Sequence, residues 1–219
     1  MIRSKKELEF YMLADRMMNR GRFKPTLKDR LRDVVFPDYI MRYLRSMRVS
    51  SYLFRESERN EPDSPRQDSP GLLMWIKGVY HSIRYRRLGV KLGYSIGRHS
   101  LGYGVVLSHY GTIVVGETNR IGRYAVLHTS TCVSDNGKTI GDAFYLATGA
   151  KVVGGVNLGD NVTVGANAVV SRPCEEGNCL LTGIPASAQK KAGAWYEGLE
   201  PYAERVEKIE ALRKQMNLD

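Results

Sequence analysis

Aliphatic residues recur every six positions from Ile96 to about Val170, and a glycine or another small residue often follows directly. The clearest aliphatic positions are Ile121, Leu127, Val133, Ile140, Leu146, Val152, Leu158, Val164 and Val170. A six-residue repeat is typical of a β-helix, in which each unit forms one short strand and one turn. An antiparallel sandwich also fits Gly-rich alternation, but it has longer strands and no reason to keep a strict register. We therefore predict a mainly β fold, a parallel β-helix whose turn glycines take a positive φ.

The repeat breaks its register at two places. Leu107 and Val115 belong to frames that differ by two residues, so an irregular stretch that contains His109 lies between them. At 136–139 one extra residue precedes the next aliphatic position, with the polar and glycine signals of a turn. Loops that leave a rigid scaffold are common positions for functional residues. We therefore expect the chemistry of the chain at these breaks.

Helical spacing of apolar residues flanks the repeat. We expect helices over residues 4–20, 29–35, 38–47 and 72–88, and an amphipathic last helix over 201–216. Three prolines and many charges at 56–70 predict a linker or loop. The predicted organisation is an α-helical N-terminal region at 1–89, a β-helix domain at 90–187, and a C-terminal tail and helix at 188–219. The last helix would either cap the open end of the solenoid or pack on a neighbouring subunit.

Positive charge is concentrated before the repeat. Residues 1–95 contain 21 Lys or Arg and 11 Asp or Glu, whereas residues 96–219 contain 12 of each. This imbalance fits peripheral contact with a membrane surface or a polyanion. The solvated faces of helices are the simpler explanation for most of these charges. Aromatic and basic residues do not interleave in a recognisable motif, so we expect no nucleic-acid partner.

The sequence also bears on the compartment. No apolar run is long enough to span a membrane, and the charged N-terminal segment lacks the apolar core of a secretory signal. Cys132, Cys174 and Cys179 are odd in number and form no CxxC pair, so we expect free thiols. These features predict a cytoplasmic protein.

A specific motif lies at the first register break. The stretch from Ser108 to Gly122 reads Ser-His-Tyr-Gly-Thr-Ile-Val-Val-Gly-Glu-Thr-Asn-Arg-Ile-Gly. It resembles, without gaps, the active-site segment of serine acetyltransferases, and its Val-Val-Gly-Glu-Thr core is the most specific part. The resemblance resumes from Ile140 to the Gly-Ile-Pro-Ala tetrad that begins at Gly183. In all it covers somewhat less than half of the chain.

The resemblance implies a fold, a cosubstrate and a base. It implies a homotrimer of left-handed β-helices, or a dimer of such trimers, with acetyl-CoA in a groove between neighbouring coils. His109 falls on the family's general base, which takes the proton of the acceptor hydroxyl as its oxygen attacks the thioester. Thr148 and Ala166 fall where the family places small residues along the pantetheine arm, although both also suit a plain turn. Lys190 is a candidate for the adenosine phosphates or a solvent-facing charge.

Three departures from the family bear on the acceptor. Ser108 replaces the acid that precedes the histidine, and the more distant acid that orients the imidazole falls near Ser95. The family's loop with an Arg-His-Pro sequence is missing, because residues 134–138 run almost straight into the next strand. The Asp and Arg groups hold the charged ends of serine, and each desolvated charge needs a partner. We therefore predict a sugar or glycan hydroxyl as the acceptor. The residues expected to hold it are Ser108, Tyr110 and Asn136.

Other functions stay open. Serine O-acetyl transfer in cysteine biosynthesis is the alternative within the same chemistry. A non-catalytic β-helix binding or scaffold protein would have no affinity for acetyl-CoA. A zinc site of His99, His109 and His128 is a further alternative, because three imidazoles and an open position suit a hydratase or hydrolase. Their spacing is unlike that of β-helical carbonic anhydrases, and we expect no metal.

Overall fold

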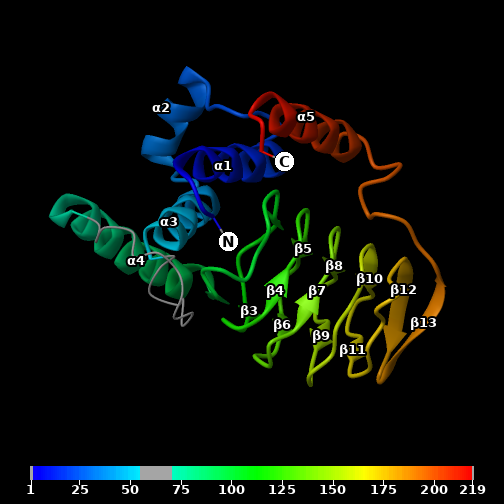
Figure 1. Cartoon of the computed structure of the whole chain (residues 1–219). Helices are drawn as coiled ribbons and strands as arrows, with labels where there is room; N and C mark the ends of the chain where they lie inside the picture. The colour runs from blue at the N-terminus through cyan, green and yellow to red at the C-terminus, as the bar shows by residue number, and fades with distance from the viewer. Residues whose placement is uncertain (1, 55–70, 219) are drawn as a thin grey trace.

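Helices precede and follow the repeat along the chain, as the apolar spacing predicts, and in space the last helix lies beside the first (Figure 1). The computed structural model describes residues 2–54 and 71–218, so the predicted linker at 56–70 lies outside the described residues. The helices are α1 (Lys5–Arg20), α2 (Leu27–Val35), α3 (Tyr39–Leu53), α4 (Leu72–Leu92) and, after the repeat, α5 (Tyr202–Gln215). Ser4 and Thr26 begin α1 and α2, because each side chain accepts a backbone N–H of the first turn.

The repeat folds into a parallel β-helix with three faces. The first face contains β1 (Tyr94–Ile96), β3 (Ile113–Val115), β6 (Thr131–Val133), β9 (Lys151–Val152) and β11 (Val169–Val170). The second contains β2 (Val106–Leu107), β5 (Val126–Leu127), β8 (Tyr145–Leu146), β10 (Val162–Val164), β12 (Cys179–Gly183) and, antiparallel at its edge, β13 (Ala186–Lys191). The third contains β4 (Arg120–Ile121) and β7 (Thr139–Ile140). The predicted fold class is confirmed.

Aliphatic side chains of successive coils stack inside the prism. Leu107, Leu127 and Leu146 occupy equivalent positions on neighbouring coils, and all three are buried. Because each coil places its aliphatic residue above the last, the core is a continuous column rather than a set of separate clusters. The six-residue period of aliphatic residues in the sequence therefore follows from this stacking inside the prism.

Close approach of neighbouring coils explains the glycine after Ile121. A Cβ on Gly122 would lie 2.3 Å from Asp142 Oδ1 and 2.7 Å from the backbone carbon of Gly141 on the next coil. The prediction of a positive φ is wrong for Gly122, which is not among the positive-φ residues. The position needs glycine because two backbones pass too close for a side chain.

Both register breaks are confirmed by the strand pairing. Leu107 and Val115 lie eight positions apart, whereas the equivalent residues of the next coil, Leu127 and Val133, lie six apart. One extra residue at 136–139 likewise lengthens the turn between β6 and β7 relative to the turn between β3 and β4. The extra residues are accommodated at corners of the prism, so the pairing on either side stays in register.

A buried ion pair joins the N-terminal helices to the first coil. Arg48 of α3 donates from Nε to Asp15 Oδ2 of α1 at 2.9 Å, and both side chains are at most 2% exposed. Arg48 also donates to the backbone oxygen of Leu101 at 2.6 Å. Asp15 Oδ1 accepts the backbone N–H groups of Gly104 and Val105 at 2.9 and 3.2 Å. Backbone groups of the first coil are thus satisfied by helix side chains.

The C-terminal helix does not cap the far end of the solenoid. Val206 and Ile209 of α5 are buried in a cluster with Phe10 of α1 and Tyr124 of the coil, and α5 lies beside α1 (Figure 1). The prediction of a cap at the open end is therefore wrong for this chain. At the far end β13 pairs with β12 instead, and hydrogen bonds cover the last strand of that sheet.

Helices α2 and α4 expose large apolar side chains. On α4 these are Leu72, Leu73, Trp75, Ile76, Tyr80, Ile83 and Val90, and on α2 they are Leu27, Leu31, Val34 and Val35. Within the described ranges, no helix combines the length and apolar character that a membrane crossing requires. The described part of a single chain therefore leaves many large apolar side chains exposed on two helices, which is typical of interaction faces.

Candidate functional site

The first register break places two residues on a projecting corner. Ser108 is equivalent to His128 on the next coil, and Gly111 is equivalent to Thr129, since the strands on either side pair in register. His109 and Tyr110 lie between them without counterparts, and both are exposed. We call these two residues the corner bulge. They project where the second face turns into the first.

Hydrogen bonds hold the base of the corner bulge. The Tyr94 hydroxyl of β1 donates to the backbone oxygen of His109 at 2.7 Å. Burial raises the pKa of Tyr94, so its hydroxyl stays protonated and remains a donor. The N–H of Gly111 donates to the backbone oxygen of Leu92, at the end of α4, at 2.9 Å. The bulge is thus fixed by groups outside its own turn.

A second imidazole lies beside the bulge. The His128 ring packs on Tyr145 with centroids 5.1 Å apart, and its Nε2 is buried without a hydrogen-bond partner among the described residues. Burial, and secondarily the nearby His109, lowers the pKa of His128. The lowered pKa favours the neutral form of His128, whose ring is partly buried. His109 is exposed, so it is the imidazole of this corner that a ligand can reach.

No carboxylate of the described residues hydrogen-bonds to the His109 ring. This agrees with the sequence, in which Ser95 stands where the family has an acid. Ser95 lies on β1, opposite Val114, and is exposed. Ser108 and Tyr110 flank His109 in the chain. The predicted contacts Ser108 and Tyr110 therefore belong to the same corner as the candidate base.

Small residues continue this corner along the solenoid. Thr148 and Ala166 follow β8 and β10 at positions equivalent to Thr129, and the N–H of Asn167 donates to the backbone oxygen of Thr148 at 3.0 Å. Both candidate residues are exposed. The corner thus carries an accessible column that starts at the bulge and leads away from the helices. Lys190 lies off this column. It is on β13, where it pairs with Leu180 of β12.

Asn136 lies at a different corner, between the first and third faces. There the N–H of Thr118 donates to Asp135 Oδ1 at 3.0 Å, which ties the loop to the preceding coil. Lys138 is 1% exposed, and its Nζ donates to the backbone oxygen of Ser134 at 2.6 Å. One chain therefore does not bring Asn136 to the corner bulge.

The histidines of the zinc alternative do not form a cluster. Across residues 2–54 and 71–218, no three His, Cys, Asp or Glu side chains lie close enough to hold a metal ion. His99 Nδ1 lies 2.8 Å from Ser51 Oγ of α3, and burial lowers the pKa of His99 to about 4. All three cysteines are free thiols, as predicted, with the Cys174 and Cys179 sulfurs 2.9 Å apart.

Serine acetyltransferases are relatives of this chain in sequence. The serine acetyltransferase of Synechococcus elongatus is 29% identical over 133 residues, which cover 53% of this chain and 54% of that protein. That of Helicobacter pylori is 35% identical over 77 residues, 32% of this chain and 45% of that protein. No family model matches the chain.

Solved serine acetyltransferases share the fold. A serine acetyltransferase in complex with CoA has a TM-score of 0.60 and 17% identity, covering 84% of this chain and 71% of that chain. The enzyme of Neisseria gonorrhoeae has a TM-score of 0.58 and 16% identity, covering 89% and 71%. The chain is serine acetyltransferase-like. It spans about half the length of the curated relatives it matches.

Sequence reasoning missed two features of this serine acetyltransferase-like chain. Tyr94 is a single tyrosine at the start of a strand, and only the folded coil brings its hydroxyl to His109. The arginines of α1, α2 and α3 are visible in the sequence as charge excess, but their gathering into one cleft depends on helix packing. Composition shows an excess of basic residues before the repeat, and it does not show that these residues meet in space.

Proposed function

We propose that the protein is an acetyl-CoA-dependent O-acetyltransferase that moves an acetyl group to a hydroxyl, with His109 as general base. The corner bulge is the observation that carries this proposal. Two extra residues raise an imidazole out of a rigid coil, at the corner that also carries Thr148 and Ala166. Relatives named serine acetyltransferase, one of them solved with CoA, support the same chemistry.

The proposed reaction needs one proton transfer at the imidazole. A neutral His109 takes the proton of the acceptor hydroxyl as its oxygen attacks the thioester carbonyl carbon. Backbone N–H groups of the coil stabilise the oxyanion that develops. The carbon–sulfur bond then breaks, the thiolate takes the proton from the imidazolium, and an acetyl ester and CoA leave. Tyr94 holds the backbone of His109 and acts as a positioning residue.

The acceptor has two candidates. Serine is favoured by the names of the relatives. A sugar hydroxyl, predicted from the sequence, has no support from the comparisons. It is favoured by Ser108, which supplies a hydroxyl where a serine site would need a carboxylate, and by the exposed ring of Tyr110. Hydrogen-bonding and aromatic groups suit a polyhydroxyl compound better than a zwitterion.

The proposed assembly is a homotrimer, with acetyl-CoA and the acceptor meeting between neighbouring subunits. The apolar side chains that α2 and α4 leave exposed support association of more than one chain. Asn136 could contact the acceptor only from a neighbouring subunit, because within one chain it lies at another corner of the prism. Contact of the basic N-terminal region with a membrane or polyanion stays a prediction.

Thiol release from acetyl-CoA tests the function. Wild type should consume acetyl-CoA with serine or with a sugar, and His109→Ala should lower kcat by about 10²–10⁴-fold, the usual contribution of a general base. His81→Ala, on α4, is the matched control and should keep full activity. Full activity in His109→Ala would exclude this base. A protein without thermal shift by acetyl-CoA and without turnover would instead be a binding or scaffold protein.

A further inference from the structure

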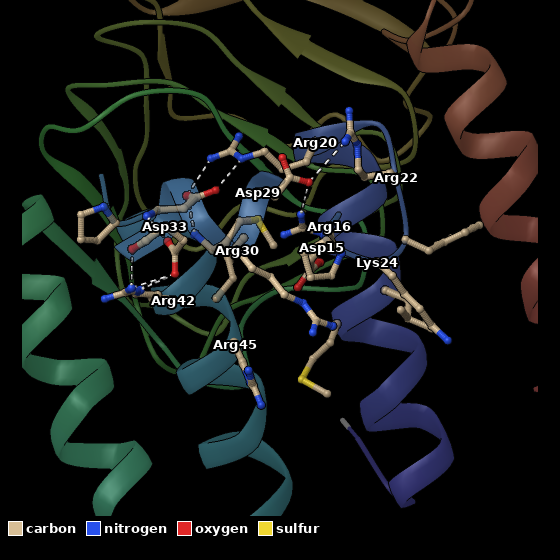
Figure 2. A pocket seen from close by; sticks show the side chains of 18 of the residues that line it. Asp15, Arg16, Arg20, Arg22, Lys24, Asp29, Arg30, Asp33, Arg42 and Arg45 are labelled. Carbon is tan, nitrogen blue, oxygen red and sulfur yellow. Dashed lines mark hydrogen bonds and ion pairs between the residues drawn. The ribbon is translucent and has the colours of Figure 1, made fainter. Parts of the chain in front are cut away.

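A cleft opens beside the corner bulge, between α1, α2 and α3 (Figure 2). Its volume is about 770 Å³, within the range of small-molecule sites. Tyr110, which is 62% exposed, forms part of its wall. The cleft therefore reaches the residue next to His109, on the side of the helices rather than along the coils.

Positive charge dominates the walls of this cleft. Eight arginine and lysine side chains of the described residues line it, against five carboxylates. One of these carboxylates, Asp15, is already held at 2.9 Å by Arg48, which does not line the cleft. Figure 2 shows arginines of all three helices gathered around the space. An anion that enters gains from an excess of positive charge that the cleft does not neutralise itself.

The ion pairs of the cleft are of two kinds. Arg20 donates to both oxygens of Asp38 at 2.6 and 2.8 Å, which is a tight bidentate pair. Asp29 is instead shared: Arg16 lies 3.4 Å away, Arg22 lies 3.3 Å away, and a third arginine, on α2, lies 3.7 Å away. One carboxylate cannot satisfy three guanidinium groups. The side of the cleft between α1 and α2 therefore keeps unused donors.

Further donors have no carboxylate partner. Arg30 of α2 and Arg45 of α3 line the cleft, and no ion pair joins either to a carboxylate of the described residues. Arg16 Nε is buried and has no hydrogen-bond partner within the described ranges. Burial lowers the pKa of Arg16, the cost of holding its charge away from water. An anionic oxygen at this place would satisfy the donor and offset that cost.

We propose that this cleft binds a phosphate group of the acceptor, so that the acceptor is a phosphorylated compound with a free hydroxyl. The role of the ligand as acceptor rests on the proposed function, whereas the phosphate site rests on the cleft alone. A phosphate monoester carries about −1.5 to −2 charges and several strong acceptor oxygens, which match a surplus of guanidinium donors. With the phosphate between α1 and α2, the hydroxyl end extends past Tyr110 to His109.

The phosphates of CoA fit this cleft less well. The column of small residues that suits the pantetheine arm, Thr148 and Ala166, lies on later coils and leads away from the helices. The N-terminal helices pack on the first coil, at the opposite end. Two anionic ligands at opposite sides of His109 would place a thioester and a hydroxyl on either side of one base.

Binding of inorganic pyrophosphate to the full chain tests the site without catalysis. Isothermal titration should show at least tenfold weaker binding for Arg30→Gln combined with Arg45→Gln. Arg86→Gln combined with Arg87→Gln is the matched control: it removes the same charge from exposed positions of α4 outside the cleft and should bind as wild type. His109→Ala should also bind as wild type. If both double variants weakened pyrophosphate binding equally, the net charge of the protein alone would explain the loss, and the proposed site would be wrong.

Acetyl transfer to matched acceptors tests the acceptor role. Glucose is compared with glucose 6-phosphate, which differ only in the phosphate. A nucleoside diphosphate sugar is compared with a polyprenyl phosphate sugar in micelles, and this second comparison separates soluble from lipid-borne phosphate. The cleft variant should raise KM for the phosphorylated acceptor at least tenfold and leave KM for acetyl-CoA unchanged. A rise in KM for acetyl-CoA instead, or equal KM values of wild type for glucose and glucose 6-phosphate, would overturn the proposal. No transfer at all, with pyrophosphate binding intact, would refute the proposed function and leave the phosphate site standing.

Discussion

Replacing Asp15 by Asn tests whether the helical region and the coil fold as one unit. The amide keeps an oxygen that can accept the N–H groups of Gly104 and Val105, which Asp15 Oδ1 accepts now. It removes the negative charge that faces Arg48, whose side chain is 2% exposed. Arg48 would remain in the interior with only neutral acceptors, which are the amide oxygen and the backbone oxygens of Leu101 and Gly102. The substitution therefore isolates the ionic part of the contact.

The expected loss is large because water cannot reach the stranded charge. Breaking a buried ion pair by removing one partner costs about 3–5 kcal/mol. A domain of this size changes its Tm by roughly 2–4 °C per kcal/mol, so Tm should fall by roughly 6–20 °C. Removing both charges, in Asp15→Asn combined with Arg48→Met, should cost less than the sum of the two single changes, since no unpaired ion is then left inside.

Urea denaturation followed by circular dichroism, at one fixed protein concentration, measures these changes. Glu204→Gln is the matched control, because Glu204 pairs with Lys208 on the surface of α5 at 2.6 Å with both side chains more than half exposed. Its cost should be close to zero, because water and salt screen an exposed pair. If Asp15→Asn costs no more than this control, the buried pair does not hold the helices to the coil.

Two further predictions concern the coil. Gly122→Ala should lower the free energy of unfolding by about 1–3 kcal/mol, because its Cβ would lie 2.3 Å from Asp142 Oδ1. The control Gly155→Ala should change the free energy of unfolding little, because the space around Gly155 is open. Equal urea midpoints of the two variants would contradict the close-approach argument. His99 has a pKa lowered to about 4 by burial, below its unfolded value of about 6.5, so the unfolded state binds more protons and stability should fall as pH drops through this interval. His99→Gln should remove that part of the pH dependence, and an unchanged slope would show that His99 does not cause it.

The coil was predictable because its signal is local and repeated. Ile121, Leu127 and Val133 follow one another at intervals of six residues, and the two extra residues between Leu107 and Val115 indicate the bulge from the sequence alone. The helices follow from apolar spacing in the same way. Such patterns survive in sequence because each coil meets the same packing requirement as the one before it.

Contacts between distant segments were not predictable. Asn136 was predicted to hold the acceptor together with Ser108 and Tyr110, and within one chain it lies at another corner of the prism. The last helix was expected either to cap the open end of the solenoid or to pack on a neighbouring subunit, yet Val206 and Ile209 pack in a cluster with Phe10 of α1. The sequence offers several surfaces on which an amphipathic helix can bury its face, and only tertiary packing chooses among them.

The corner bulge also divides the molecule into two parts that can vary separately. Its two residues lie outside the strand register, so replacing or lengthening them leaves Leu107 and Ile113 in place. On one side of the bulge lies the column of small residues on the coils, and on the other side lies the arginine-lined cleft between the helices. Under the proposed roles, grafting different N-terminal helices onto the same solenoid would change which hydroxyl compound binds and would leave the column proposed for acetyl-CoA unchanged.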